Sequence, residues 1–156
     1  MISRNEWPQL RAGTSIRNAV RILRILSEEQ KILHGHSTPL VLDDDYNLLG
    51  IIRLTDLLRS IRHLCDDPDK ACNLDEATGP VSELVIQFPG RLSPEDSILE
   101  ALDIMTNHGV SLLPVMDNGK LMGLIKLSDV FDKVAAILFD EPGSEERSWI
   151  TQYLHS

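Results

Sequence analysis

One seven-residue pattern occurs twice in this chain of 156 residues. The first copy is GIIRLTD, from Gly50 to Asp56, and the second, 73 residues later, is GLIKLSD, from Gly123 to Asp129. Both copies keep the glycine, the aliphatic positions, a base, a hydroxyl and the closing aspartate. Such a repeat predicts two copies of one small unit that pack against each other, because neither copy is large enough to bury both of its faces alone.

The repeat extends upstream of this pattern. HGHSTPLVLD begins at His34, and HGVSLLPVMD begins at His108. After each of these stretches, Asp, Asn and Gly residues separate two aliphatic runs, which is the signature of a β-hairpin. Each copy is therefore expected to contain a hairpin that ends in the repeated pattern.

Helices are expected on both sides of each hairpin. The first helix starts at Thr14 or Ser15, and its counterpart starts with Ser93 as the cap, Pro94 in the first turn and Asp96 completing the signal. A second helix follows each closing aspartate. The stretch VSELVIQ (81–87) reads as a strand-like lead-in to the second copy, whereas the first copy lacks part of its leading strand.

The domain organisation follows from these elements. Residues 1–65 form the first unit, 66–80 a linker rich in charge, Pro and Gly, 81–140 the second unit, and 141–156 a C-terminal helical extension. The extension carries an apolar stripe that either covers its own unit or docks on a second subunit. The stripe consists of Trp149, Ile150, Tyr153 and Leu154.

Composition excludes several classes of function. The net charge of −9 argues against a general nucleic-acid binder or a binder of anionic membranes. No apolar run approaches the roughly 18 residues that span a bilayer, and the N-terminus lacks the apolar core of a signal peptide. The expected protein is soluble and cytoplasmic. It carries none of the common catalytic motifs, so we expect no enzyme.

Two stretches could suggest a metal site, and neither is expected to be one. His34 and His36 form an HGH sequence, but no carboxylate or cysteine at a recognisable spacing completes a ligand set. DDDYN (43–47) lacks the glycine and the closing glutamate of a calcium loop. A turn histidine and a polar hairpin turn explain these stretches better.

The repeated pattern supports two interpretations of its closing residues. Thr55 and Asp56 stand where a helix begins, and free N–H groups and the positive end of the helix dipole gather there. The hydroxyl and the carboxylate could simply stabilise the start of the helix. Alternatively, the N–H groups could bind an anion, and the aspartate could accept hydrogen bonds from the two hydroxyls of a ribose.

Taken together, the hairpins, the glycine-led strands and the aspartates that open helices resemble the CBS (cystathionine β-synthase) domain. The match is closest in SPEDSILEALDIMTNHGVSLLPVMDNGKLMGLIKLSDVF of the second copy. The resemblance implies an α+β fold in which small sheets pack on helices and two units, related by pseudo-twofold symmetry, form a so-called Bateman module. It also implies association into a homodimer that regulates a protein partner not identified by the sequence.

The resemblance further implies a regulatory module that binds AMP, ADP or ATP in the cleft between its copies. Asp56 and Asp129 would then hold the ribose. The family often has a hydroxyl residue three positions before the aspartate, near the phosphates, but here Arg53 and Lys126 stand there. Thr55 and Ser128 instead lie next to the aspartates. The cations either favour a longer phosphate chain or are solvated strand ends. The alternative function is a ligand-free module for dimerisation or partner docking.

Overall fold

The structure is a computed structural model, and it describes residues 2–3, 7–28, 38–65, 79–140 and 150. The chain forms two compact units. One, here called the N-terminal unit, comprises Asn5–Gln87; the other, the C-terminal unit, comprises Phe88–Ser156 together with Met1–Arg4. Residues 81–87, which the repeat places at the start of the second copy, thus group with the first.

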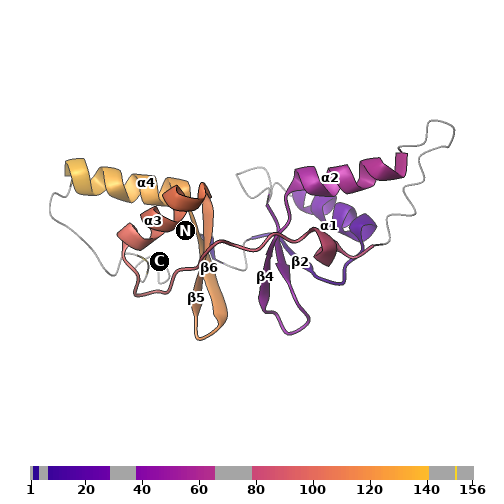
Figure 1. Ribbon diagram of the computed structural model, residues 1–156, viewed down its shortest axis with the longest axis horizontal. Helices are drawn as coiled ribbons and strands as arrows, with labels where there is room; N and C mark the ends of the chain where they lie inside the picture. The colour runs from indigo at the N-terminus through magenta and orange to yellow at the C-terminus, as the bar shows by residue number, and fades with distance from the viewer. Residues whose placement is uncertain (1, 4–6, 29–37, 66–78, 141–149, 151–156) are drawn as a thin grey trace. The chain divides into compact units, whose positions relative to one another are not determined.

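The N-terminal unit is built on a three-stranded sheet in the order β2–β3–β4. Strand β2 (Gln9–Arg11) runs parallel to β3 (Leu40–Leu42), which forms an antiparallel hairpin with β4 (Leu48–Ile51). Helices α1 (Ile16–Glu28) and α2 (Leu54–Arg62) pack on this sheet, and the short 3-10 helix η2 (His63–Cys65) continues α2 (Figure 1). The predicted hairpin and both flanking helices are confirmed.

The core of this unit joins the strands to both helices. Buried apolar side chains from each element share one cluster, which comprises Leu10, Ile16, Ala19, Leu23, Val41, Ile52, Leu57 and Val81. Helix α1 begins as expected, since the Ser15 hydroxyl accepts a hydrogen bond from the N–H of Asn18 at 3.1 Å. The buried side chains of α1, namely Ile16, Ala19 and Leu23, hold this helix against the sheet.

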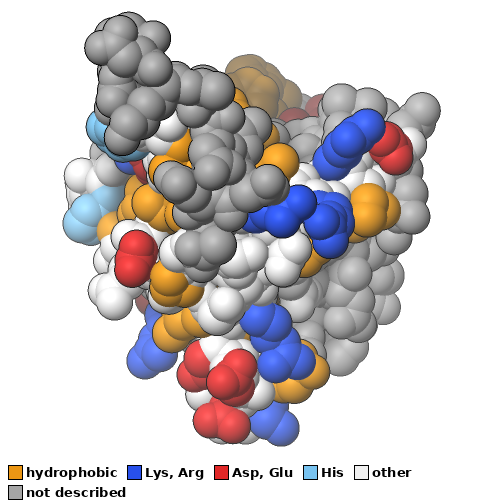
Figure 2. All heavy atoms as spheres, turned by 90° about the vertical axis from the view of Figure 1, so that its right-hand side faces the viewer, with side chains coloured by type: hydrophobic (Ala, Val, Ile, Leu, Met, Phe, Trp, Pro, Cys, Tyr) orange, Lys and Arg blue, Asp and Glu red, His pale blue; other side chains and the backbone are white. Residues whose placement is uncertain are grey.

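The turn of the β3–β4 hairpin is organised by Asp43. Its Oδ1 accepts hydrogen bonds from the N–H groups of Asp45 and Asn47, at 2.9 and 2.8 Å. Tyr46 adopts a positive φ of 63°, and the Arg11 guanidinium lies over its ring. Acidic side chains gather at this turn, at the lower end of the face seen in Figure 2. The prediction of a polar hairpin turn is confirmed.

The C-terminal unit repeats the plan with a sheet in the order β1–β6–β5. Strands β5 (Leu112–Asp117) and β6 (Lys120–Lys126) form the second hairpin, and β1 (Ile2–Ser3) pairs with β6. Helices α3 (Ile98–His108) and α4 (Leu127–Ala135) flank the hairpin, and a π-helical turn, η5 (Ala136–Asp140), extends α4. Small sheets packed on helices confirm the predicted α+β class.

Helix α3 begins four residues later than predicted. Ser93 and Asp96 instead form a turn, in which the Asp96 carboxylate accepts from the Ser93 N–H at 2.8 Å. The helix starts after Ser97, whose N–H donates to the Glu100 carboxylate at 2.9 Å. Two Ser-x-x-acid patterns follow each other here, and the second one, which precedes the apolar stripe, is the helix start.

The edge strands also differ from the prediction. Residues 81–87 do not lead into the second hairpin: Val81–Leu84 form a 3-10 helix, η4, and Ile86 pairs antiparallel with Ile51 of β4. Leu92 is the residue that pairs parallel with β5, at Val115. The first copy has its own leading strand, because β2 occupies the corresponding place beside β3.

Part of the C-terminal extension covers its own unit. Ile150 is fully buried and belongs to the core cluster that includes Leu92, Met105 and Ile125. At this residue the apolar stripe therefore packs inside the C-terminal unit. Trp149, Tyr153 and Leu154 lie outside the described residues, as do His34 and His36.

Candidate functional site

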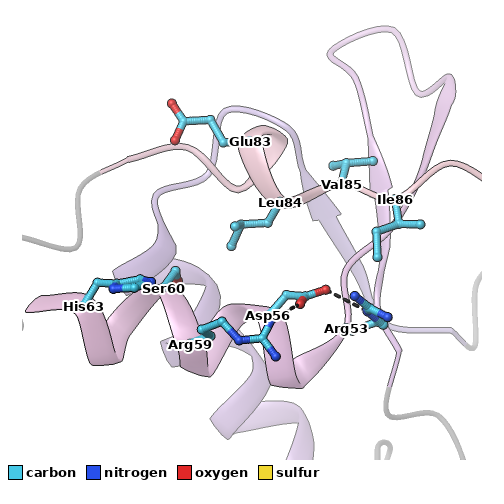
Figure 3. A pocket seen from close by; sticks show the side chains of 9 residues that line it. All are labelled: Arg53, Asp56, Arg59, Ser60, His63, Glu83, Leu84, Val85 and Ile86. Carbon is cyan, nitrogen blue, oxygen red and sulfur yellow. Dashed lines mark hydrogen bonds and ion pairs between the residues drawn. The ribbon is translucent and has the colours of Figure 1, made fainter.

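A pocket in the N-terminal unit contains the first repeated aspartate. It has a volume of about 390 Å³ and is formed by the start of α2 on one side and by η4 with the residues that follow it on the other. Nine residues line it, namely Arg53, Asp56, Arg59, Ser60, His63, Glu83, Leu84, Val85 and Ile86. The pocket thus combines polar groups from the helix with an apolar wall (Figure 3).

Asp56 lies between two arginine side chains in this pocket. Arg53 Nε donates to one carboxylate oxygen, Oδ2, at 2.7 Å, and Arg59 Nη1 donates to the other, Oδ1, at 2.9 Å. The Asp56 side chain is only 14% exposed, whereas those of Arg53 and Arg59 are 59% and 67% exposed. Each guanidinium therefore uses one side on the carboxylate and keeps further N–H groups for other acceptors.

The local helix geometry explains this arrangement. Arg53 is the N-cap residue of α2 and has an extended backbone, so its side chain turns back along the first helical turn. Asp56 lies three positions into the helix, and Arg59 follows one turn later on the same face. The spacing i, i+3, i+6 thus brings base, acid and base together.

The charges around Asp56 shift its ionisation. The hydrogen bond from Arg53 is the largest cause of a lowered pKa of the Asp56 carboxyl, and the charges of Arg53 and Arg59 act in the same direction. The same contact raises the pKa of Arg53. At neutral pH Asp56 is therefore an ionised carboxylate held between two guanidinium groups.

The apolar wall stands close to β4 because of a glycine. Backbone hydrogen bonds join Ile51 and Ile86 in both directions, at 2.9 and 2.8 Å. A Cβ on Gly50 would lie 2.2 Å from the carbonyl oxygen of Ile86. The glycine of the repeated pattern is thus needed for the segment that carries Val85 and Ile86 to reach the sheet and form the wall.

In the second copy of the pattern, the aspartate holds a backbone N–H group. The Asp129 carboxylate accepts a hydrogen bond from the backbone N–H of Lys126 at 2.9 Å, so it stabilises the first turn of α4. The repeat places Asp132 where the first copy has Arg59. The two copies therefore differ in the charge one turn into the helix.

The sequence prediction singled out six residues, and the structure brings two of them to the pocket. Arg53 and Asp56 line it together. Thr55 and Ser128 are exposed at the second helical position, and neither lines this pocket. Lys126 and Asp129 lie in the C-terminal unit.

Sequence reasoning missed Arg59, Ser60 and His63, and the wall from Glu83 to Ile86. The sequence did contain an indication for Arg59, because a basic side chain three residues after an acidic one lies on the same face of a helix. The wall carried no such signal, because its contact with β4 joins segments 35 residues apart in the chain.

Comparison with known proteins places these features in a family. The family model of the CBS domain matches residues 3–63 and 81–136, which together make up most of the chain. The chain therefore belongs to the CBS-domain family, and the predicted tandem pair is confirmed.

Relatives among characterised and uncharacterised proteins share part of this chain. It is 35% identical over 63 residues to an inosine-5'-monophosphate dehydrogenase of Korarchaeum cryptofilum, which covers 40% of this chain and 13% of the dehydrogenase. It is 26% identical over 98 residues to an uncharacterised 17.7 kDa protein of Acidianus ambivalens, covering 62% and 53%. The chain thus spans about half or less of the length of these relatives.

Solved structures share the fold. CBSX2 in complex with AMP has a TM-score of 0.62 at 22% identity, covering 88% of this chain and 94% of the other. The cytosolic domain of the Mg²⁺ channel MgtE in complex with ATP has a TM-score of 0.61 at 22% identity, covering 85% and 46%. At these identities the likeness shows a common fold.

Other classes of site are not found in the described part of the chain. No group of three or more His, Cys, Asp or Glu side chains there could hold a metal ion. Among the same residues, no helix has the length and apolar character needed to cross a membrane.

Proposed function

We propose that this protein is a regulatory CBS-pair module that binds an adenine nucleotide in the pocket of the N-terminal unit. The observation that carries the proposal is the position of Asp56, a largely covered carboxylate held by two guanidinium groups at a pocket with an apolar wall. The AMP and ATP complexes of CBSX2 and MgtE support the choice of ligand class.

Each part of the pocket suits one part of a nucleotide. Leu84, Val85 and Ile86 offer an apolar surface for the flat base. The Asp56 carboxylate can accept hydrogen bonds from two ribose hydroxyls. The exposed N–H groups of Arg53 and Arg59 can donate to phosphate oxygens, and the fork of a guanidinium matches a phosphate well.

The arginines favour a ligand with several phosphates. We expect ATP and ADP to bind more tightly than AMP, and adenosine and S-adenosylmethionine to bind more weakly than all three. Part of this difference should disappear at high salt, because exposed charges are screened. A ligand that binds only the folded protein raises its melting temperature, so thermal shift with these five compounds and NADH gives the ranking directly.

Asp56→Ala tests the carboxylate in this proposal. The substitution should weaken ATP binding by about 1.5–3 kcal/mol, the scale of a hydrogen bond to a charged group, as measured by calorimetry. Asp45→Ala is a matched control, because Asp45 is an exposed acid in the β3–β4 turn and does not line the pocket. ATP affinity that is unchanged in Asp56→Ala would contradict the proposal.

For the second copy, we propose that Asp129 has a structural role. The hydrogen bond that its carboxylate accepts from the Lys126 N–H supports this proposal. The alternative function is a module that binds no ligand and serves dimerisation or partner docking. If none of the nucleotides raises the melting temperature at millimolar concentration, that alternative is favoured.

A further inference from the structure

Both oxygens of the Asp56 carboxylate already accept hydrogen bonds from arginine side chains. Arg53 holds Oδ2 and Arg59 holds Oδ1, so a guanidinium N–H already occupies each carboxylate oxygen. Each oxygen has about two acceptor positions, yet two bulky guanidinium groups flank a side chain that is 14% exposed. Ribose hydroxyls must therefore compete with the arginines for the space around Asp56.

We infer that Arg53 and Arg59 form a gate over Asp56, which polyphosphate opens by drawing the guanidinium groups away from the carboxylate. This inference rests on the proposed nucleotide function and deepens it. Phosphate oxygens and the Asp56 carboxylate are acceptors for the same N–H groups. The phosphates of a bound nucleotide therefore take over the hydrogen bonds of both guanidinium groups. The Asp56 carboxylate can then accept hydrogen bonds from the ribose of the same nucleotide.

The exposure of the three side chains fits such an exchange. Arg53 and Arg59 are mostly exposed, so their long side chains can swing between two acceptors with little rearrangement of the core. Exposed ion pairs are individually weak, so a ligand that offers stronger contacts can break them. Asp56 itself is held by the helix and stays in place.

Other charged groups near the pocket do not take over this role. Glu83 lines the pocket from η4, and Figure 3 shows its carboxylate pointing away from Asp56. His63, the first residue of η2, lies beyond Ser60 as seen from Asp56 (Figure 3). Arg62 is exposed on the same helix and is not among the residues that line the pocket.

The gate makes an unusual prediction for Arg59→Met. This variant keeps an unbranched, flexible stem but removes the charge and the N–H donors of the guanidinium. ATP affinity should fall about tenfold, because one charge-assisted contact to phosphate is lost. Adenosine affinity should rise about three- to fivefold, because one competitor for Asp56 is gone and an exposed pair is worth up to about that factor.

Calorimetry with ATP and with adenosine on four proteins tests this: the wild type, Arg59→Met, Arg53→Met and the matched control Arg62→Met. The two pocket variants should shift the two affinities in opposite directions, and Arg62→Met should shift neither. A fall in ATP affinity with no rise in adenosine affinity would overturn the gate and leave the proposed function standing. Absence of ATP binding to the wild type would overturn both.

Arginine side-chain NMR provides a second measurement on the wild-type protein. The Nε–H signal of Arg53, assigned through Arg53→Met, should move when ATP or pyrophosphate is added and stay in place with adenosine. If adenosine moves this signal as far as ATP does, the ribose alone displaces the guanidinium, and phosphate is not what opens the site.

Discussion

At the scale of single residues, the two repeated aspartates accept hydrogen bonds from different kinds of donor. Asp56 is held by guanidinium side chains three residues before and after it. Asp129 accepts a hydrogen bond from the backbone N–H of Lys126, and Asp132 stands one turn further on. A duplicated sequence motif therefore predicts a duplicated backbone more reliably than it predicts a duplicated site.

The ion pairs predict how Asp56 titrates. The pKa of Asp56 is lowered in the folded protein, so the stability that this carboxylate contributes is fully present above its unfolded pKa of about 3.8. That stability is lost as the pH falls through the folded value. Arg53→Met should raise the pKa of Asp56, and Arg59→Met should raise it less, because the Arg53 hydrogen bond is the largest cause of the shift. Carboxyl ¹³C NMR measures both changes. Arg62→Met should leave the titration unchanged.

An alanine in place of Gly50 should strongly destabilise the N-terminal unit. In Gly50→Ala the new Cβ meets the carbonyl oxygen of Ile86, a backbone atom that cannot swing aside. The free energy of unfolding should fall by roughly 2–3 kcal/mol, as for overpacking in a tight site. Gly13→Ala is the control, because nothing lies within 4 Å of its Cβ position and it should be nearly neutral. Equal denaturation midpoints for the two variants would contradict the close approach.

At the scale of elements, the sequence predicted which segments form helices and hairpins, and it was less accurate about where they begin. Helix α3 shows why, since Ser93–Asp96 and Ser97–Glu100 carry the same start signal. Only packing decides between them: Ile98 is buried and opens the apolar stripe of the helix. The pairing of Ile86 with Ile51 was not predictable either, because no local periodicity marks a single bridging residue.

Helix α4 provides a test of the structural role of Asp129. Loss of the carboxylate leaves the Lys126 N–H without this acceptor, so Asp129→Ala should reduce the free energy of unfolding by about 1 kcal/mol. Asp132→Ala, on the exposed face of the same helix, should change it little. Urea denaturation compares the two. ATP affinity in Asp129→Ala should stay at the wild-type value if the N-terminal unit holds the ligand.

At the scale of the whole molecule, we predict a homodimer. The middle of α4 exposes Phe131, which is 71% exposed, and the η5 turn exposes Leu138 and Phe139, of which Phe139 is 80% exposed. Apolar side chains of this size in a row favour an interface, and isologous pairing is the commonest arrangement of small oligomers. Light scattering at micromolar concentration should give twice the chain mass of 17.5 kDa.

Substitution in the exposed apolar row tests where the dimer forms. Phe131→Glu with Phe139→Glu should give a monomer, whereas Met122→Gln, on β6, should leave the dimer intact. A wild-type protein that scatters as a monomer, or a double variant that remains dimeric, would show that this row is not the interface.

Ile86 lies close in the chain to a residue that belongs to the second sheet. Ile86 forms the pocket wall and is hydrogen-bonded to β4, and Leu92 is hydrogen-bonded to Pro114 and Met116 of the other sheet. Five residues, 87–91, lie between Ile86 and Leu92. An extended backbone spans at most about 3.5 Å per residue, and both flanking residues are hydrogen-bonded to a sheet. The residue that lines the pocket and the residue that joins the second sheet are thus linked directly by a short stretch of backbone.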